Sequence, residues 1–305
     1  MVKIAIATSS FAEFDRAPLD MLKKAGVEYV LNQIGRTLSE AEVTDLLRDC
    51  AGIAAGTEPL TRAVMQANPQ LRVISRCGTG MDSVDRAAAE ELGIKVFNTP
   101  DAPTQAAAEH TLALMLSMLR HIPRMDADTR AGVWKKRMGN LLCGKRVGIV
   151  GAGRIGRRVA TLVEAFGGEV NCHDPFASEC PYPLRALPDL LFWADIVSLH
   201  CAKPSSGTET IGPVELARMR KGSWLVNAAR GGLVDENALA EAIREQHLVG
   251  AALDVFVSEP YSGPLRDLPQ VVLSPHAASY AREARVEMET STIRNLLVGL
   301  GFETV

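Results

Sequence analysis

The feature that most constrains this chain is a glycine-rich turn between an apolar, strand-like run and a segment of helical length. The run is Arg146–Val150, and Gly151, Gly153 and Gly156 follow it with the spacing G-x-G-x-x-G. In this context the first glycine permits a tight turn and the second lets the backbone approach a pyrophosphate. The third lets the helix pack closely on the strand. The sequence therefore predicts a dinucleotide-binding turn.

An acidic residue at a suitable distance strengthens that prediction. Asp174 lies 174 − 156 = 18 positions beyond the last glycine, directly after the strand-like run Glu169–His173. Its carboxylate can accept hydrogen bonds from the adenosine ribose and would repel the additional phosphate of NADP. An Asp that only forms a turn before Pro175 is the alternative. NAD is the predicted cofactor, with the amides of Arg154 and Ile155 facing its phosphates at the helix N-terminus.

The remaining sequence alternates short apolar runs with amphipathic segments, a pattern typical of α/β proteins with parallel sheets. At about 150 residues per domain, the 305 residues accommodate two domains. The first set of expected strands is Lys3–Ala7, Gly52–Ala55, Arg72–Ser75 and Lys95–Phe97, and the second is Arg146–Val150, Glu169–His173, Ile196–His200, Trp224–Asn227, Ala251–Phe256 and Val271–Ser274. We expect two doubly wound parallel sheets, and the chain passes from the first to the second between Asn98 and Gln105.

Several helices are predicted between and after these strands. The segment Ser39–Asp49 begins with Ser39 and Glu42 spaced as in a capping box. Thr104–Arg120 is apolar on nearly all sides in its second half, which predicts a helix buried between two bodies. The segment Ile122–Lys145 matches neither sheet and fits an arm that reaches a partner subunit or an exposed connector equally well. A last helix is expected at Ala281–Leu297.

Composition argues against several classes of partner. The 33 Lys and Arg residues are balanced by 36 Asp and Glu residues and interspersed with them, so no basic face is expected for a nucleic acid. The N-terminal run Val2–Ala7 has the length of a strand rather than that of a secretory signal. The most apolar helical stretch, Ala106–Leu119, contains Glu109 and His110 and is too short to span a bilayer. We expect a cytoplasmic protein without a membrane or nucleic-acid partner.

The six cysteines form no C-x-x-C pair and no zinc-like grouping, which favours reduced and mostly buried thiols. Two Cys–His neighbours, Cys172 with His173 and His200 with Cys201, lie at the ends of strand-like runs. Adjacent side chains on a strand point to opposite faces, so neither pair can readily chelate one ion. No metal site is predicted.

Polar residues come shortly after three of the later expected strands. They are Arg230, Glu259 and His276. Ligands of open parallel sheets bind outside the carboxyl ends of the strands, so these side chains are expected near the cofactor. Taken singly, His276 could be a structural histidine, Arg230 a helix-capping cation and Glu259 an exposed loop charge. Their joint placement beside a dinucleotide motif favours catalysis.

The chemistry of these three groups suits one reaction class. A guanidinium matches a carboxylate with two parallel hydrogen bonds, so Arg230 can anchor an acid. An imidazole can give a proton to a carbonyl oxygen as hydride reaches its carbon, or remove one from a hydroxyl, which is the role predicted for His276. A carboxylate beside the imidazole, here Glu259, stabilises its charged form and orients the ring. The combination predicts hydride transfer between a 2-hydroxy acid and its 2-keto acid.

Taken together, these segments resemble the D-isomer-specific 2-hydroxyacid dehydrogenase family over nearly the whole chain. The matching signatures are Arg76–Asp85, Val96–Pro100, Ala108–Thr111, Gly151–Gly156, Asn227–Asp235, Leu253–Pro260 and Ser274–His276. The resemblance implies catalytic roles for Arg230, Glu259 and His276, in agreement with the chemical argument. It also implies substrate contacts at Arg76, Cys77 and Gly78, and cofactor contacts near Thr104, Ala228 and Asp254.

The resemblance further implies a discontinuous architecture. A flavodoxin-like substrate domain would comprise residues 1–98 and 285–305, and a Rossmann NAD-binding domain would be inserted at residues 99–284. Homodimers are usual in the family, with an arm around the segment that here contains Trp134. This would explain the segment Ile122–Lys145.

Within the family, Ala54–Pro59 and Ile74–Asp82 resemble phosphoglycerate dehydrogenase-like members. Two departures bear on the substrate. Such members have Arg and Ser where Gly56 and Thr57 align and Asn near Pro103, and these ligands of the phosphorylated substrate are missing here. The regulatory domain that often follows is also expected to be absent, because the sequence ends at residue 305.

Three functions therefore stay open. The first is an NAD-dependent D-2-hydroxyacid dehydrogenase that acts on an acid such as 3-phosphoglycerate. The second is a glyoxylate or hydroxypyruvate reductase, because small residues around Gly56 leave room for an unphosphorylated acid. The third is a non-catalytic scaffold that senses NADH and binds peptide partners, as transcriptional corepressors of this family do.

Overall fold

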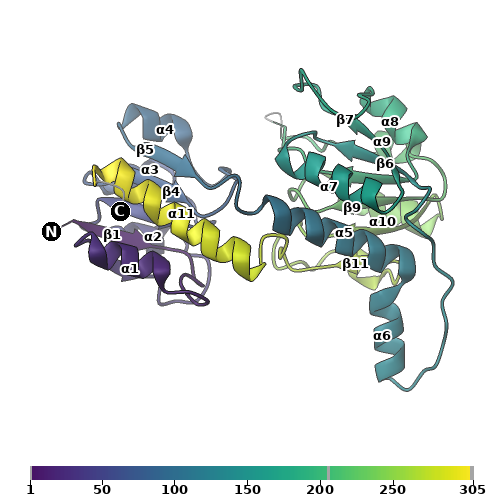
Figure 1. The fold of residues 1–305 in the computed structure, drawn as a ribbon, viewed down its shortest axis with the longest axis horizontal. Coiled ribbons are helices and arrows are strands. Elements are labelled where there is room, and N and C mark those ends of the chain that lie inside the picture. The colour runs from purple at the N-terminus through teal and green to yellow at the C-terminus, as the bar shows by residue number, and fades with distance from the viewer. Residues whose placement is uncertain (1, 205–206, 303–305) are drawn as a thin grey trace. The chain divides into compact units, whose positions relative to one another are not determined.

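The structure is a computed structural model that describes residues 2–204 and 207–302 (Figure 1). Its contacts divide the chain into two compact units. The first is Met1–Pro103 together with Ser279–Val305, as far as these residues are described, and the second is Thr104–Ala278. The expected domain limits were 98/99 and 284/285, a few residues from these boundaries.

The first unit contains a five-stranded sheet in which all paired strands are parallel. Its strands are β1 (Lys3–Ile6), β2 (Glu28–Leu31), β3 (Gly52–Ala55), β4 (Val73–Arg76) and β5 (Lys95–Asn98). They lie in the order β2-β1-β3-β4-β5, which is the flavodoxin-like order. Strand β2 was not predicted because, as a short edge strand, it keeps most of its side chains exposed and lacks the pattern of a buried strand.

Helices cover both faces of this sheet, because successive side chains of a strand point to opposite sides. The helices are α1 (Ala17–Lys24), α2 (Glu40–Leu46), α3 (Arg62–Ala67), α4 (Arg86–Glu91) and α11 (Arg282–Leu300). Ile4 and Ile6 of β1 pack with α1 and α11, whereas Ala5 packs with α2, α3 and α4. The predicted capping box is confirmed, since Ser39 and Glu42 cap α2 reciprocally.

The second unit contains a six-stranded, all-parallel sheet. Its strands are β6 (Arg146–Val150), β7 (Glu169–His173), β8 (Ile196–Leu199), β9 (Ser223–Asn227), β10 (Leu248–Leu253) and β11 (Val271–Leu273). Their order is β11-β10-β9-β8-β6-β7, and a parallel bridge between Cys172 and Leu184 adds one more position beyond β7. The six positions from Leu184 to β10 reproduce the Rossmann order 3-2-1-4-5-6, with β11 as a further strand. The predicted fold class, two doubly wound parallel-sheet units, is therefore confirmed.

Two layers of helices enclose the second sheet. They are built from α5 (Thr104–Arg120), α7 (Arg154–Ala165), α8 (Leu187–Trp193), α9 (Pro213–Arg218) and α10 (Glu236–Arg244), with the short 3-10 turn η1 (Pro264–Asp267). Met115 of α5 and Val159 of α7 pack on one face, and Leu190, Leu216 and Leu239 pack on the other. The bounds predicted for α5 are confirmed. The strand predicted at Ala251–Phe256 is observed at Leu248–Leu253, and it ends earlier because the chain bends at Asp254.

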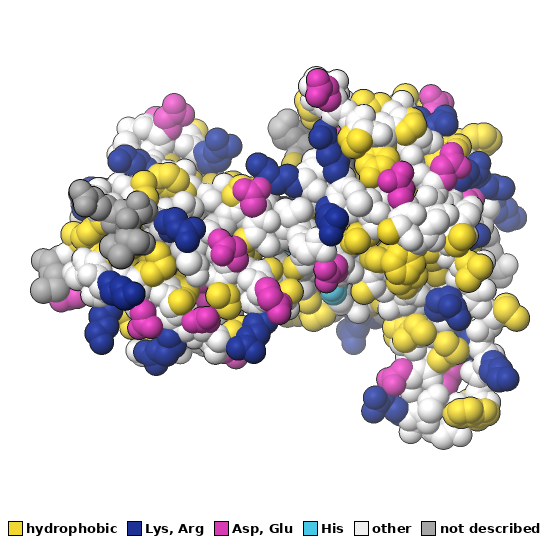
Figure 2. Space-filling view, in the orientation of Figure 1, with side chains coloured by type: hydrophobic (Ala, Val, Ile, Leu, Met, Phe, Trp, Pro, Cys, Tyr) yellow, Lys and Arg dark blue, Asp and Glu magenta, His cyan; other side chains and the backbone are white. Residues whose placement is uncertain are grey.

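An exposed segment follows α5 in the second unit. Helix α6 (Ile122–Arg130) has no buried residue, and an irregular stretch leads from it to β6. Trp134 and Met138 on this stretch are 87% and 93% exposed. Apolar side chains are visible on this projecting part of the molecule, and charges of both signs are interspersed over the face shown in Figure 2. Among the described residues, no helix is long and apolar enough to cross a membrane.

Candidate functional site

The glycine-rich turn has the geometry that its sequence predicts. Gly151 adopts φ +99°, and a Cβ atom there would come within 2.6 Å of the Cys201 nitrogen. A Cβ atom on Gly156 would overlap the carbonyl oxygen of Gly151. Gly153, by contrast, has open space where its side chain would be. Any side chain at the first or third glycine would therefore displace the turn, whereas the second glycine leaves its backbone open to a ligand.

The first turn of α7 fits a pyrophosphate. Gly153 is the N-cap of this helix and makes no side-chain cap hydrogen bond. The N–H groups predicted to face the phosphates, those of Arg154 and Ile155, lie in the first turn of this helix. Because the helix has 12 residues, its dipole adds a favourable field for an anion at this end. The residues present thus fit a dinucleotide at this position.

Asp174 ties the end of β7 to the glycine-rich turn. Its Oδ2 atom accepts the N–H of Ala152 at 2.9 Å, and its Oδ1 atom accepts the N–H of Phe176 at 2.9 Å. A carboxylate has about four acceptor positions, so two remain for hydroxyl groups of a ribose. The side chain therefore braces the turn and can still recognise a ligand.

His276 and Glu259 form a hydrogen-bonded pair. The Nδ1 atom of His276 lies 2.9 Å from Oε2 of Glu259, whose Oε1 atom accepts the N–H of Phe256 at 3.1 Å. Because the carboxylate can only accept, Nδ1 must carry the proton. The imidazole side chain is 48% exposed. Its Nε2 atom is thus the one left to exchange a proton with a bound molecule.

The backbone of His276 adopts a left-handed conformation with φ +53°. Such a conformation costs a non-glycine residue of the order of 1–3 kcal/mol and persists only where the surroundings impose it. Asp254 imposes it here. Its carbonyl oxygen accepts the N–H of His276 at 2.8 Å, and its carboxylate accepts the N–H groups of Ala277 at 2.8 Å and Ala278 at 2.9 Å.

The Asp254 side chain is fully buried and closely surrounded by donors. Ser274 Oγ donates to its Oδ1 atom at 2.6 Å, and His110 Nε2 lies 3.2 Å from the same oxygen. Burial alone would raise the pKa of this carboxyl, but the hydrogen bonds from His110, Ser274, Ala277 and Ala278 outweigh it and lower the pKa. Asp254 is therefore a buried carboxylate that organises the loop carrying His276.

Arg230 follows β9, and the side chain of Asn227 shapes the turn that carries it. Asn227 Nδ2 donates to the Arg230 carbonyl at 3.0 Å, and its Oδ1 atom accepts the N–H of Ala229 at 3.1 Å. Arg230 Nη1 donates to the Ala229 carbonyl at 2.7 Å. Since β9, β10 and β11 are neighbours in a parallel sheet, Arg230, Asp254 and His276 follow strands that end at the same edge.

The predicted substrate-loop residues lie in the first unit, directly after or at the end of β4. Arg76 donates to the Cys77 carbonyl, and the Gly78 N–H donates to Thr99 Oγ1 at 2.8 Å. Gly78 adopts φ +136°, where a side chain would also meet the Arg76 guanidinium. Cys77 is only 4% exposed, and burial raises the pKa of its thiol. The thiol therefore packs in the core and is poorly suited to react.

The two remaining predicted cofactor residues are placed at element ends. Thr104 begins α5, and Ala228 directly follows β9 at the carboxyl edge of the second sheet. The Cys–His neighbours are engaged otherwise. Cys172 is buried with a pKa raised to about 12 by burial, and His173 Nδ1 lies 2.9 Å from the Arg185 carbonyl oxygen. Among the described residues, no group of three or more His, Cys, Asp or Glu side chains is placed to hold a metal.

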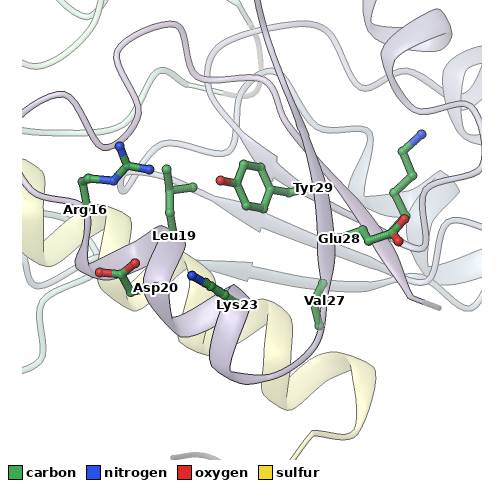
Figure 3. A pocket seen from close by; sticks show the side chains of 8 residues that line it. Arg16, Leu19, Asp20, Lys23, Val27, Glu28 and Tyr29 are labelled. Atoms are coloured by element: carbon green, nitrogen blue, oxygen red, sulfur yellow. The ribbon is translucent and has the colours of Figure 1, made fainter.

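A separate pocket in the first unit does not belong to this site. It is lined by Arg16, which precedes α1, and by residues of α1, β1 and β2 that include Lys23 and Tyr29 (Figure 3). Lys3 and Glu28, which also line it, are the first residues of their strands. The pocket thus lies at the amino ends of the strands, opposite the edge where α/β sheets bind ligands.

Two residues of the site received no role from the sequence. His110 and Ser274 belong to the signatures Ala108–Thr111 and Ser274–His276, but nothing in the sequence indicates that they meet at Asp254. His110 lies 144 positions from Asp254. The only available signal was a polar residue within the most apolar helix, which is costly to bury without a partner.

A family model and several curated proteins match this chain. Residues 112–278 match the family model described as D-isomer specific 2-hydroxyacid dehydrogenase, NAD binding domain. A D-3-phosphoglycerate dehydrogenase of Mycobacterium leprae is 41% identical over 250 residues, which cover 79% of this chain and 47% of that protein. The chain spans about half the length of the curated relatives that it matches.

Solved structures match over almost the full length. The TT0316 protein of Thermus thermophilus has a TM-score of 0.92 and 36% identity, with 99% of this chain and 98% of that chain covered. A glyoxylate reductase of Paecilomyes thermophila has a TM-score of 0.88 and 29% identity, with 98% and 95% covered.

Proposed function

The chain belongs to the D-isomer-specific 2-hydroxyacid dehydrogenase family, and on this premise we propose that it is an NAD-dependent oxidoreductase that interconverts a D-2-hydroxy acid and its 2-keto acid. The observation that carries the proposal is the pair of His276 and Glu259, 2.9 Å apart, with the imidazole half exposed. Glu259 and His276 come after β10 and β11, at the carboxyl edge of the second sheet. Strand β6 of the same sheet leads into the glycine-rich turn.

The chain's own residues divide the chemistry among them. A bound nicotinamide supplies or accepts the hydride at the carbon that carries the oxygen. In the direction of reduction, His276 Nε2 donates the accompanying proton to the carbonyl oxygen, and in oxidation it removes the proton from the hydroxyl. Glu259 holds the ring through Nδ1 and stabilises the imidazolium. Arg230 binds the carboxylate of the acid with two parallel hydrogen bonds.

The first candidate substrate is 3-phosphoglycerate, with 3-phosphohydroxypyruvate as its keto form. Support comes from the curated relatives, named D-3-phosphoglycerate dehydrogenase, at 35–42% identity. A second candidate, glyoxylate or hydroxypyruvate, is favoured by the loop after β3. There Gly56 has no side chain, and the buried Glu58 accepts the Gly56 N–H at 2.8 Å, so neither residue offers a cation for a phosphate.

The test is oxidation of NADH by the purified protein, followed at the nicotinamide absorbance. The panel is 3-phosphohydroxypyruvate, hydroxypyruvate, glyoxylate, pyruvate and one bulky 2-keto acid. We expect turnover of at least one acid. A preference for 3-phosphohydroxypyruvate would support the first candidate substrate, and a preference for the small acids would support the second. Absence of turnover with every acid, combined with NADH-dependent binding of a peptide, would replace the proposal by the scaffold function.

We expect Asp174→Asn to weaken NADH binding and to reduce the preference for NADH over NADPH. The charged hydrogen bonds to the ribose and the repulsion of a 2′-phosphate are both lost, while one acceptor remains for the Ala152 N–H. The dissociation constant for NADH should rise about 10–100-fold, as measured by fluorescence titration. The exposed Asp189, at the start of α8, provides the control Asp189→Asn. Equal affinity of the unmodified protein for both cofactors would contradict the assignment.

We also propose that the chain forms a homodimer through the segment from α6 to β6. The support is its exposed apolar surface, with Trp134 87%, Met138 93% and Leu141 67% exposed. An ion pair of 2.5 Å between Arg137 and Asp128 holds the irregular stretch that follows α6 against this helix. Sedimentation should give twice the chain mass for the unmodified protein and a larger monomer fraction for Trp134→Ser with Met138→Ser. A monomeric unmodified protein at micromolar concentration would refute this proposal.

A further inference from the structure

We infer that His110 is a positioning residue for His276 in the proposed reaction, acting through the buried carboxylate of Asp254. The inference rests on the proposed function, because it concerns the group that transfers the proton. His110 lies on α5, and its side chain is 25% exposed, so it is neither a solvated surface group nor an apolar filler of the core.

The hydrogen bonds determine which atom of His110 donates. Its Nε2 atom lies 3.2 Å from Asp254 Oδ1 and 3.1 Å from Ser274 Oγ. The Ser274 hydroxyl donates its single proton to Asp254 Oδ1 at 2.6 Å, so its oxygen can only accept from His110. The pKa of Asp254 is lowered, so its carboxylate also accepts. Nε2 must therefore carry a proton that is shared between the carboxylate and the hydroxyl.

The same carboxylate holds the backbone on both sides of the strained residue. Asp254 Oδ1, which receives the His110 and Ser274 bonds, also accepts the Ala277 N–H, and Oδ2 accepts the Ala278 N–H. A rotation of the carboxylate would therefore release the two amides that follow His276. Since His276 keeps φ +53° only while these bonds persist, its ring orientation depends on the carboxylate plane.

Among the described donors to the Asp254 carboxylate, His110 is the one that comes from outside the loop after β11. Ser274, Ala277 and Ala278 all belong to that loop, so they could move together with the carboxylate. His110 instead belongs to α5, whose Met115 and Leu119 are buried against α7 and the sheet. It therefore ties the proton-transferring loop to a rigid element, which is how a supporting residue keeps a reactive group within its productive geometry.

The first test compares His110→Leu with His110→Gln. Leu is of similar size and favours the helix at least as well as His, but it removes the donor, whereas the amide nitrogen of Gln can replace Nε2. We expect kcat of the Leu variant to fall about 10–100-fold, because a displacement of about 1 Å at a reacting group has effects of this size. The KM for the keto acid and the dissociation constant of NADH should change by less than about threefold, and Gln should restore most of kcat.

Ser117→Ala provides the matched control, since Ser117 is a half-buried residue of the same helix outside the network. It should retain kcat. Full kcat in the Leu variant would overturn the inference, as would a Gln variant as slow as Leu or a loss confined to KM. Thermal unfolding of each variant identifies a general loss of folding, which would affect KM and NADH binding as well.

A second measurement does not depend on turnover and so separates this inference from the proposed function. Hydrogen exchange of the peptide containing residues 274–278 reports the amides of Ala277 and Ala278 directly. We expect exchange at least about tenfold faster in His110→Leu and near the unmodified rate in His110→Gln and Ser117→Ala. Unchanged exchange in the Leu variant would show that His110 does not hold the loop. If the protein turned over no acid but the loop loosened as expected, only the proposed function would fail.

Discussion

Replacing His276 with Asn is expected to lower kcat for the preferred keto acid by about 10²–10⁴-fold, the usual contribution of acid–base catalysis. Asn is the appropriate substitution because it tolerates the left-handed backbone better than most other non-glycine residues, so the loop should keep its shape. The KM of the acid should change little, because the imidazole acts on the proton that is transferred in the transition state. Initial rates of NADH oxidation over a range of acid concentrations measure both constants.

His247→Asn is the control for that prediction. This histidine lies at the opposite end of the sheet, just before β10, with Nε2 3.1 Å from the Leu216 carbonyl oxygen. Its replacement should leave kcat unchanged. Glu259→Gln should give a smaller loss than His276→Asn, because the amide still holds the ring but no longer stabilises the imidazolium. A His276→Asn variant with the full turnover number would refute the proton route.

Replacing Arg230 with Leu is expected to lower kcat/KM by about 10²–10⁴-fold. Two hydrogen bonds between charged groups contribute about 1.5–3 kcal/mol each, and each 1.4 kcal/mol corresponds to a factor of ten. In contrast to the His276 variant, a large part of the loss should be a raised KM, because the guanidinium already binds the carboxylate in the ground state. Steady-state kinetics with the acid as the varied substrate separates the two constants.

Arg230→Lys tests the geometry of this contact. It keeps the charge but loses the planar fork, so it should recover only part of the activity. Arg244→Leu, at the exposed end of α10, is the charge-matched control and should behave as the unmodified protein. If Arg230→Leu neither raised KM nor lowered kcat, the carboxylate of the acid would have to be bound by another cation.

Much of the fold follows from local patterns. Gly52–Ala55 and Arg146–Val150 are observed with the predicted bounds, because buried parallel strands are largely apolar runs bounded by turns. Glu169–His173 is also observed with its predicted bounds. The helix at Thr104–Arg120 is likewise confirmed. Strand β2 was missed because an edge strand is exposed along its length, and its pairing with β1 depends on a neighbour distant in sequence.

The strand near residue 251 shows where local patterns fail. The apolar run continues to Phe256, but the observed strand ends at Leu253. The chain bends at Asp254, and the carboxylate of this residue accepts hydrogen bonds from α5 and from the loop after β11. A local pattern cannot contain that information, because the partners lie far along the chain.

The residues of the candidate site were predicted from residue types and spacings. The glycine turn, Asp174 and the three polar residues after the later strands are determined locally, since each depends on the element that directly precedes it. The network of His110, Asp254 and Ser274 depended on the folded chain. Its donors converge on one buried carboxylate only after α5 has packed beside β10 and β11, and the energy of a buried polar group depends on partners brought together in space.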